Sequence, residues 1–107
     1  MPIIYSLGPR QFWRGLEGYI PVVAQAGIPG GGAVTIVNYV GRGVLVSTSY
    51  AAAAAPVAVQ IDIDGVNLIN AVIPESQFHL IGFRTALFVR MLSGGVGGPG
   101  QVTYLHE

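Results

Sequence analysis

The chain has 107 residues, of which 51% are hydrophobic and 9% are charged, with five Arg, no Lys and no Cys. A net charge of zero argues against nucleic acid as a partner, because sequence-independent binding needs many cations that neutralise phosphates. The absence of Cys excludes disulfide frameworks and cysteine zinc sites, and no apolar run approaches the roughly 20 residues of a membrane-spanning helix. Soluble domains are typically about 25% charged, so we expect an isolated copy to expose apolar patches of the kind that mark interfaces. The composition therefore predicts a homo-oligomer or a subunit of a larger assembly.

Residues 1–18 form a predicted irregular arm that precedes a single domain over residues 19–107. Its aromatic and cationic side chains lie among Gly and Pro and show no clean period. Such side chains are enriched at the centres of interfaces, and the arm is therefore a candidate strap between subunits, although the aromatic rings could equally cap the core. The candidate interface residues here are Tyr5, Phe12, Trp13 and Arg14. No cationic stretch precedes an apolar run, so a secretory signal is not expected.

Short apolar segments follow, separated by Gly and Pro. Tyr19 to Gln25 is a weak strand candidate, and Pro21 would place it at a sheet edge. Val34 to Val40 and Gly43 to Tyr50 read as strands on either side of a turn or bulge at Gly41-Arg42. Ala51 to Ala55 is expected to be a compact linker with at most one helical turn, since five residues cannot nucleate a stable helix.

The clearest element is a β-hairpin between Pro56 and Asn70. Apolar and polar residues alternate with period two before Asp64-Gly65, and an apolar segment follows. Asp-Gly between two such segments is typical of a type I′ turn, which needs positive φ at both central residues. One face of this strand is predicted to enter the core, together with two residues further along the chain: Val57, Val59, Ile61, Ile63, Leu87 and Val89.

The last third of the chain contains two further segments. Leu80 to Leu92 reads as one long strand or as two strands joined near Gly82, and Val102 to His106 alternates again. Between them, Gly94 to Gly100 is predicted to be a loop whose ordering costs entropy unless something holds it. Four of its residues complete the candidate interface: Gly94, Gly95, Gly97 and Gly98. Short strands with Gly/Pro turns and no helix predict an all-β protein, a single β-sandwich.

Catalytic and metal-binding chemistry is weakly represented. Asp62 and Asp64 would share a face of a strand, but the Gly directly after them and the distance to Glu75 do not fit a calcium loop. The spacing of His79 and His106 supports neither a metal site nor a catalytic pair. We therefore expect no catalytic residue, no metal, no cofactor and no enzymatic activity. A carbohydrate-binding module stays open as an alternative that would use exposed aromatic rings: Trp13, Tyr39, Tyr50 and Tyr104.

Four segments of the chain resemble small virion proteins of tailed bacteriophages, over roughly residues 34–106. They are Gly43 to Val46, Val59 to Gly65 with its Ile-Asp-Gly hairpin, Phe83 to Arg90, and Val102 to Tyr104. The resemblance implies a jelly-roll-like sandwich, assembled in the host cytoplasm into a virion. It implies a capsid decoration (cement) protein that forms homotrimers, contacts the major capsid protein and bridges capsomers. A tail, baseplate or fibre subunit is the alternative within the same family.

Overall fold

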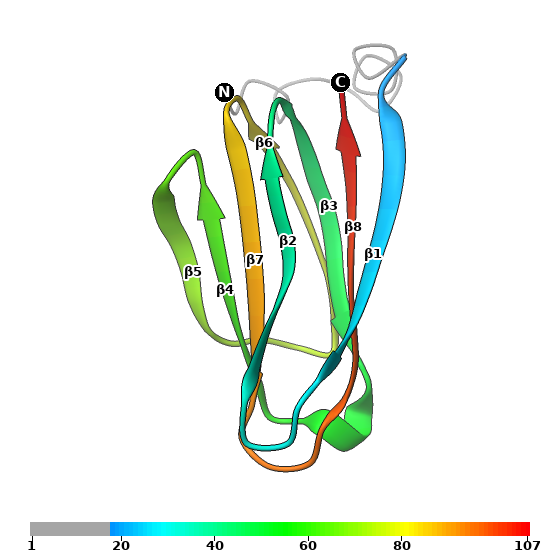
Figure 1. Cartoon of the computed structure of the whole chain (residues 1–107), viewed down its shortest axis with the longest axis vertical. Helices are drawn as coiled ribbons and strands as arrows, with labels where there is room; N and C mark the ends of the chain where they lie inside the picture. Colours follow the sequence, from blue (N-terminus) through cyan, green and yellow to red (C-terminus); the bar gives the residue numbers. More distant parts are fainter. Residues whose placement is uncertain (1–17) are drawn as a thin grey trace.

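The computed structural model describes residues 18–107 (Figure 1). Apart from Gly18, the predicted arm with Tyr5, Phe12, Trp13 and Arg14 lies outside the described residues. The described part folds into two antiparallel sheets that pack face to face. Its strands are β1 (Ile20–Ile28), β2 (Ala33–Val40), β3 (Gly43–Tyr50), β4 (Val57–Ile63), β5 (Val66–Val72), β6 (Ser76–Phe83), β7 (Ala86–Ser93) and β8 (Gly98–His106).

The order of the strands is that of a jelly roll. One sheet has the order β1-β8-β3-β6 and the other β2-β7-β4-β5. Eight strands divided between two sheets in this way make up the double Greek key of jelly-roll proteins. The prediction of an all-β, jelly-roll-like sandwich is therefore confirmed for the described residues. No helix in this part of the chain is long and apolar enough to cross a membrane.

The core lies between the two sheets and contains the side chains that alternate inward. Five of the six predicted core residues are completely buried, namely Val57, Val59, Ile61, Leu87 and Val89. Ile63 is half-buried and packs against this core. The core also includes Leu45, Phe83, Met91 and Val102, which belong to strands β3, β6, β7 and β8.

The β4–β5 hairpin has the predicted turn. Asp64 and Gly65 both have positive φ, 53° and 81°, as a type I′ turn requires. The pairing of β4 with β5 contains a bulge, because Ile61 is opposite Ile69 while Asp62 is opposite Asn67. Leu68 is the extra residue in β5 at this bulge.

Two predictions about strand boundaries are wrong. The Leu80 to Leu92 segment is two strands, but the break lies at Arg84-Thr85 and not near Gly82, and the first of them begins at Ser76. The chain must cross from one sheet to the other at this point, and the main-chain amides of the crossing are bound by Asp64, 20 residues away.

The predicted loop Gly94 to Gly100 is also shorter than expected. Gly98 and Gly100 belong to β8, where they pair with Ile28 and Ala26 of β1. A side chain at Gly100 would sit 2.9 Å from atoms of Ile36 and Met91. Gly at this position therefore lets β8 pass close to the core, whereas the sequence pattern indicated a loop.

Candidate functional site

Asp64 is a structural residue at the junction of two connections. Its carboxylate accepts hydrogen bonds from the backbone amides of Arg84 (2.9 Å), Thr85 (2.7 Å) and Ala86 (3.1 Å), and from the Thr85 hydroxyl. Burial raises the pKa of Asp64, but the hydrogen bonds from Thr85, Ala86 and Arg84 outweigh this effect and lower the pKa below its ordinary value. The side chain thus joins the β4–β5 turn to the crossing between β6 and β7.

Asp62 lies on the outer face of its sheet, and its carboxylate is also engaged in hydrogen bonds within the domain. It accepts hydrogen bonds from Asn67 Nδ2 (2.8 Å) and Gln60 Nε2 (3.2 Å). Asp64 belongs to the turn, as the hairpin prediction requires, so it does not share a strand face with Asp62, and its side chain reaches residues 84–86. Residues 18–107 contain no group of three His, Asp or Glu side chains that could hold a metal ion.

The two histidines occupy separate positions. His79 Nε2 lies 2.9 Å from the hydroxyl of the buried Thr48, and burial lowers the pKa of His79. His106 belongs to β8, and its ring centroid lies 5.0 Å from that of Tyr39. Among the hydrogen bonds of residues 18–107, neither ring contacts an Asp or Glu side chain, and His106 Nδ1 lies 3.0 Å from the main-chain oxygen of Glu107.

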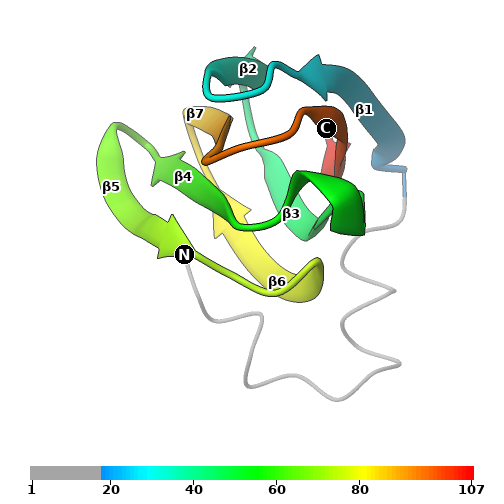
Figure 2. The same cartoon turned by 90° about the horizontal axis from the view of Figure 1, so that it is seen from below.

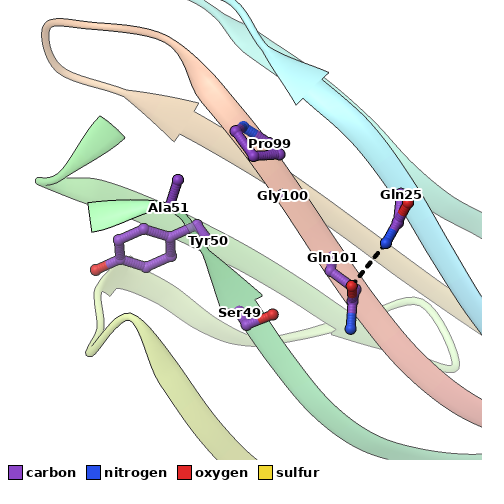
Figure 3. Close-up of a pocket in the computed structure, with 7 residues that line it drawn as sticks. All are labelled: Gln25, Ser49, Tyr50, Ala51, Pro99, Gly100 and Gln101. Atoms are coloured by element: carbon purple, nitrogen blue, oxygen red, sulfur yellow. Dashed lines mark hydrogen bonds between the residues drawn. The ribbon is translucent and has the colours of Figure 1, made fainter. Parts of the chain in front are cut away.

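A shallow depression of about 260 Å³ lies on the outer face of the β1-β8-β3-β6 sheet (Figure 3). Its polar groups are the side chains of Gln25, Gln101 and Ser49, and Gln25 Nε2 donates a 2.8 Å hydrogen bond to Gln101 Oε1. The Tyr50 ring points away from the two glutamines, and its hydroxyl donates a hydrogen bond to the carbonyl of Ile73. The depression therefore offers neutral amide and hydroxyl groups without a charge.

The aromatic rings suggested for carbohydrate binding make internal contacts. Tyr39 packs against Phe83 and Tyr104, with ring centroids 6.1 Å and 5.6 Å apart, and Tyr104 is buried. Trp13 lies outside the described residues. Tyr39 and Tyr104 thus contribute to the sandwich rather than to an open aromatic platform.

The Gly-rich connections gather at one end of the sandwich, at the bottom of Figure 1, and are seen face on in Figure 2. A side chain at Gly97 would collide with the carbonyl of Ile28, and one at Gly98 would lie 3.2 Å from Ala54 of the 3-10 turn η2 (Ala52–Ala54). Gly94 and Gly95 are exposed at the surface. The expectation that something must hold this loop is thus met within the chain, while the interface role of these four residues stays a prediction.

Ser93 ties this end together, and the sequence pattern does not indicate it. Its side chain is buried, and its hydroxyl oxygen lies 2.6 Å from the Val96 carbonyl, to which it donates, and 3.1 Å from the Ala54 carbonyl. Its backbone amide donates to the carbonyl of Gly32 at 3.0 Å. One residue therefore joins three of the four connections at this end. The only signal in the sequence is a lone Ser at the end of an apolar strand.

The described surface carries many apolar side chains. Nine large ones are exposed: Ile20, Val23, Val40, Val66, Leu68, Val72, Phe78, Leu92 and Val96. Three of the nine lie on β5, an edge strand. This surface, and not a polar cleft, is the most distinctive feature of the described residues. No protein-family model matches the chain, and no curated protein matches it either.

Proposed function

We propose that the chain is a non-enzymatic structural protein of a virion, and that it decorates the capsid of a tailed bacteriophage. The resemblance of residues 34–106 to small virion proteins suggests this role. The jelly-roll strand order is compatible with it, since viral capsid proteins, lectins and cupins all use this architecture. Because one fold hosts many functions, the surface of the domain, and not its fold, must support this role.

The observation that carries the proposal is where the side chains lie: polar groups are engaged within the domain, and large apolar side chains face outward. Asp62, Asp64 and His79 are engaged within the domain, whereas large apolar side chains face outward, with Phe78 77% exposed and Val40 82% exposed. Apolar surface of this kind marks protein–protein contact. A subunit that is covered by its neighbours in an assembly accounts for both the engaged polar groups and the exposed apolar side chains.

A decoration protein would stabilise the capsid by binding to it. A partner that binds the assembled shell but not its free subunits stabilises the assembly by mass action. In this proposal the chain forms homotrimers, binds the major capsid protein and bridges neighbouring capsomers. It needs no catalytic group, no cofactor and no metal.

The experiment is mass spectrometry of purified particles after heads and tails have been separated. The proposal expects the chain in the head fraction, with a copy number comparable to that of the major capsid protein. Recovery with tails alone would favour the tail, baseplate or fibre alternative. Absence from both fractions, with the major capsid protein detected as the internal control, would refute the virion role.

A carbohydrate-binding domain is the second candidate, and the depression beside Gln25 and Gln101 favours it. Neutral amide and hydroxyl groups suit sugar hydroxyls, because such sites use a small number of placed polar groups. A glycan array tests this candidate. Retention of a glycan by the native chain and its loss in Gln101→Ala, with the fold unchanged by circular dichroism, would support it, and no retained glycan would exclude it.

A further inference from the structure

The two sheets leave four edge strands, and they differ in how well they are protected. On one side of the sandwich β1 and β2 lie against each other (Figure 2). On the opposite side, β6 is kinked by a bulge at His79 and Leu80, where Leu80 has a φ of 52°. Bulges of this kind discourage pairing at a sheet edge. The remaining edge is β5.

Apart from the bulge at Leu68, β5 lacks the usual protection of an edge strand. Natural edges carry Lys, other charges or Pro, or they are very short. β5 has seven residues, none of them charged and none of them Pro. Its large apolar side chains are exposed: Val66 by 66%, Leu68 by 53% and Val72 by 62%. Within residues 18–107 no strand pairs with β5 on the side away from β4.

The residue order of β5 selects a second copy of the same strand as its occupant. Because of the bulge at Leu68, Asn67 and Asn70 both point to the outer face, as partners of Asp62 and Gln60. Val66 and Ala71 share the opposite, core-facing side, as partners of Ile63 and Val59. Residues directly opposite each other in an antiparallel pair share a face.

One antiparallel register of β5 with itself satisfies this condition for two kinds of residue pair, which cover four of the seven residues of the strand. When a two-fold axis passes between Leu68 and Ile69, Asn67 is opposite Asn70 of the second copy, and Val66 is opposite Ala71 of the second copy. Moving the register by one residue in either direction places outer-face residues opposite core-facing ones. The strand is therefore self-complementary, as an isologous two-fold contact requires.

We propose that β5 pairs antiparallel with β5 of a second copy, so that the two β2-β7-β4-β5 sheets join into one continuous eight-stranded sheet. The contact pairs the free backbone groups of both edges, and it brings together two pairs of asparagine amides and the exposed apolar side chains. This proposal does not rest on the virion role, but it is incompatible with a strict homotrimer, which is the state that the decoration proposal adopts. A two-fold contact produces assemblies with an even number of copies, whereas the resemblance implies trimers.

Cysteine cross-linking tests the register, since the chain contains no cysteine of its own. An equimolar mixture of Val66→Cys and Ala71→Cys, one of them carrying a mass tag, is oxidised mildly. Opposite residues have Cα atoms about 4.5–5.5 Å apart, within the range of a disulfide. Two copies of Val66→Cys would instead hold their cysteines five residues apart, roughly 16 Å. The expected product is the mixed disulfide, in several-fold excess over the disulfides formed by either variant alone.

The matched control replaces Val66→Cys by Val40→Cys, which is 82% exposed on β2, an edge strand of the same sheet. This control should cross-link with Ala71→Cys no faster than random collision allows. Equal yields from the two mixtures would overturn the proposal. Circular dichroism verifies that all three variants are folded, so a low yield from the Val66 mixture counts against the pairing.

Solution mass provides a second measurement on the whole chain. The native chain should reach twice its 11.2 kDa or a higher even multiple. Leu68→Lys should halve the mass, and Val23→Lys, at an almost equally exposed site on β1 (55% against 53%), should leave it unchanged. A chain that is monomeric at every concentration, or strictly trimeric, would overturn the proposal. A chain that is monomeric when intact and dimerises only when residues 1–17 are removed would show that those residues cover the β5 edge. This result would also overturn the proposal.

Discussion

Replacement of Asp64 by Asn removes the charge that binds the crossing between the two sheets and keeps the shape of the side chain. Asp64 has a φ of 53°, and Asn is among the few residues that tolerate this left-handed conformation. The variant therefore leaves the turn intact and removes the carboxylate that accepts from Arg84, Thr85 and Ala86. Any loss of stability reports the negative charge of the acceptor, because the amide oxygen of Asn can still accept these hydrogen bonds.

The size of the loss follows from the number of donors and from their exposure. Hydrogen bonds to a charged group contribute about 1.5–3 kcal/mol in mutational series. The Asp64 carboxylate is exposed to solvent, which screens its interactions, and water can reach the amides that it would release. We therefore expect Asp64→Asn to lower the free energy of unfolding by about 1–2 kcal/mol. For a domain of this size each kcal/mol lowers Tm by roughly 4–8 °C.

Urea unfolding at several pH values, followed by far-ultraviolet circular dichroism, measures the loss. The pKa of Asp64 is lowered in the folded chain, and that of an unfolded Asp is about 3.9. Its contribution is thus fully present above about pH 4 and disappears as the pH falls through the folded pKa. The difference between the native chain and Asp64→Asn should be largest at pH 7 and should vanish in strong acid. Because the chain has only five acidic residues, few other carboxylates contribute to the pH dependence of stability between pH 7 and strong acid.

Two results would refute this reasoning about Asp64. The first is a difference that persists unchanged in strong acid, which would show that the charge is irrelevant. The second is an equal free energy of unfolding for the native chain and for Asp64→Asn at pH 7. Asp64→Ala and Asp64→Gly separate the backbone effect, since Ala alone adds the left-handed cost of about 1–2 kcal/mol.

Three further predictions concern packing, close backbone approach and pH. Phe83→Ala should destabilise the domain by about 3–5 kcal/mol, because Phe83 is 1% exposed, whereas Phe78→Ala on the same strand, 77% exposed, should stay within about 0.5 kcal/mol by urea unfolding. Gly97→Ala should cost about 1–3 kcal/mol, since the new side chain meets the backbone of the β1–β2 connection, while Gly95→Ala, with open space around it, should change Tm little. Burial lowers the pKa of His79, so the free energy of unfolding should fall as the pH drops below about 6.5. His79→Gln should remove this contribution to the pH dependence of stability. Parallel pH profiles of the native chain and His79→Gln would contradict the prediction.

The elements that depend on local pattern could be predicted from the sequence. The period-two alternation from Val57 and the Asp64-Gly65 turn define the β4–β5 hairpin without reference to the rest of the molecule, and the structure confirms both. Pro21 correctly predicts that the first strand lies at an edge. The Ala tract contains a single 3-10 turn, as its length and the following Pro56 allow.

The features that depend on distant partners could not be predicted in this way. The break between β6 and β7 is set by Asp64, and the strand character of Gly98 and Gly100 comes from pairing with β1. Ser93 acts through carbonyl groups on two other connections. Each of these contacts joins residues far apart in the sequence, and no local spacing carries information about it.

The position of β8 between β1 and β3 has a consequence for how the protein is made. β8 is an inner strand of its sheet and follows the other seven strands in the chain, so β1 has no partner in that sheet until residues 98–106 leave the ribosome. Such long-range closure is slow, because the entropy of joining distant segments is lost before their contacts form. A prematurely terminated chain would expose the interior of the sandwich, which makes incomplete products of this gene targets for chaperones and proteases.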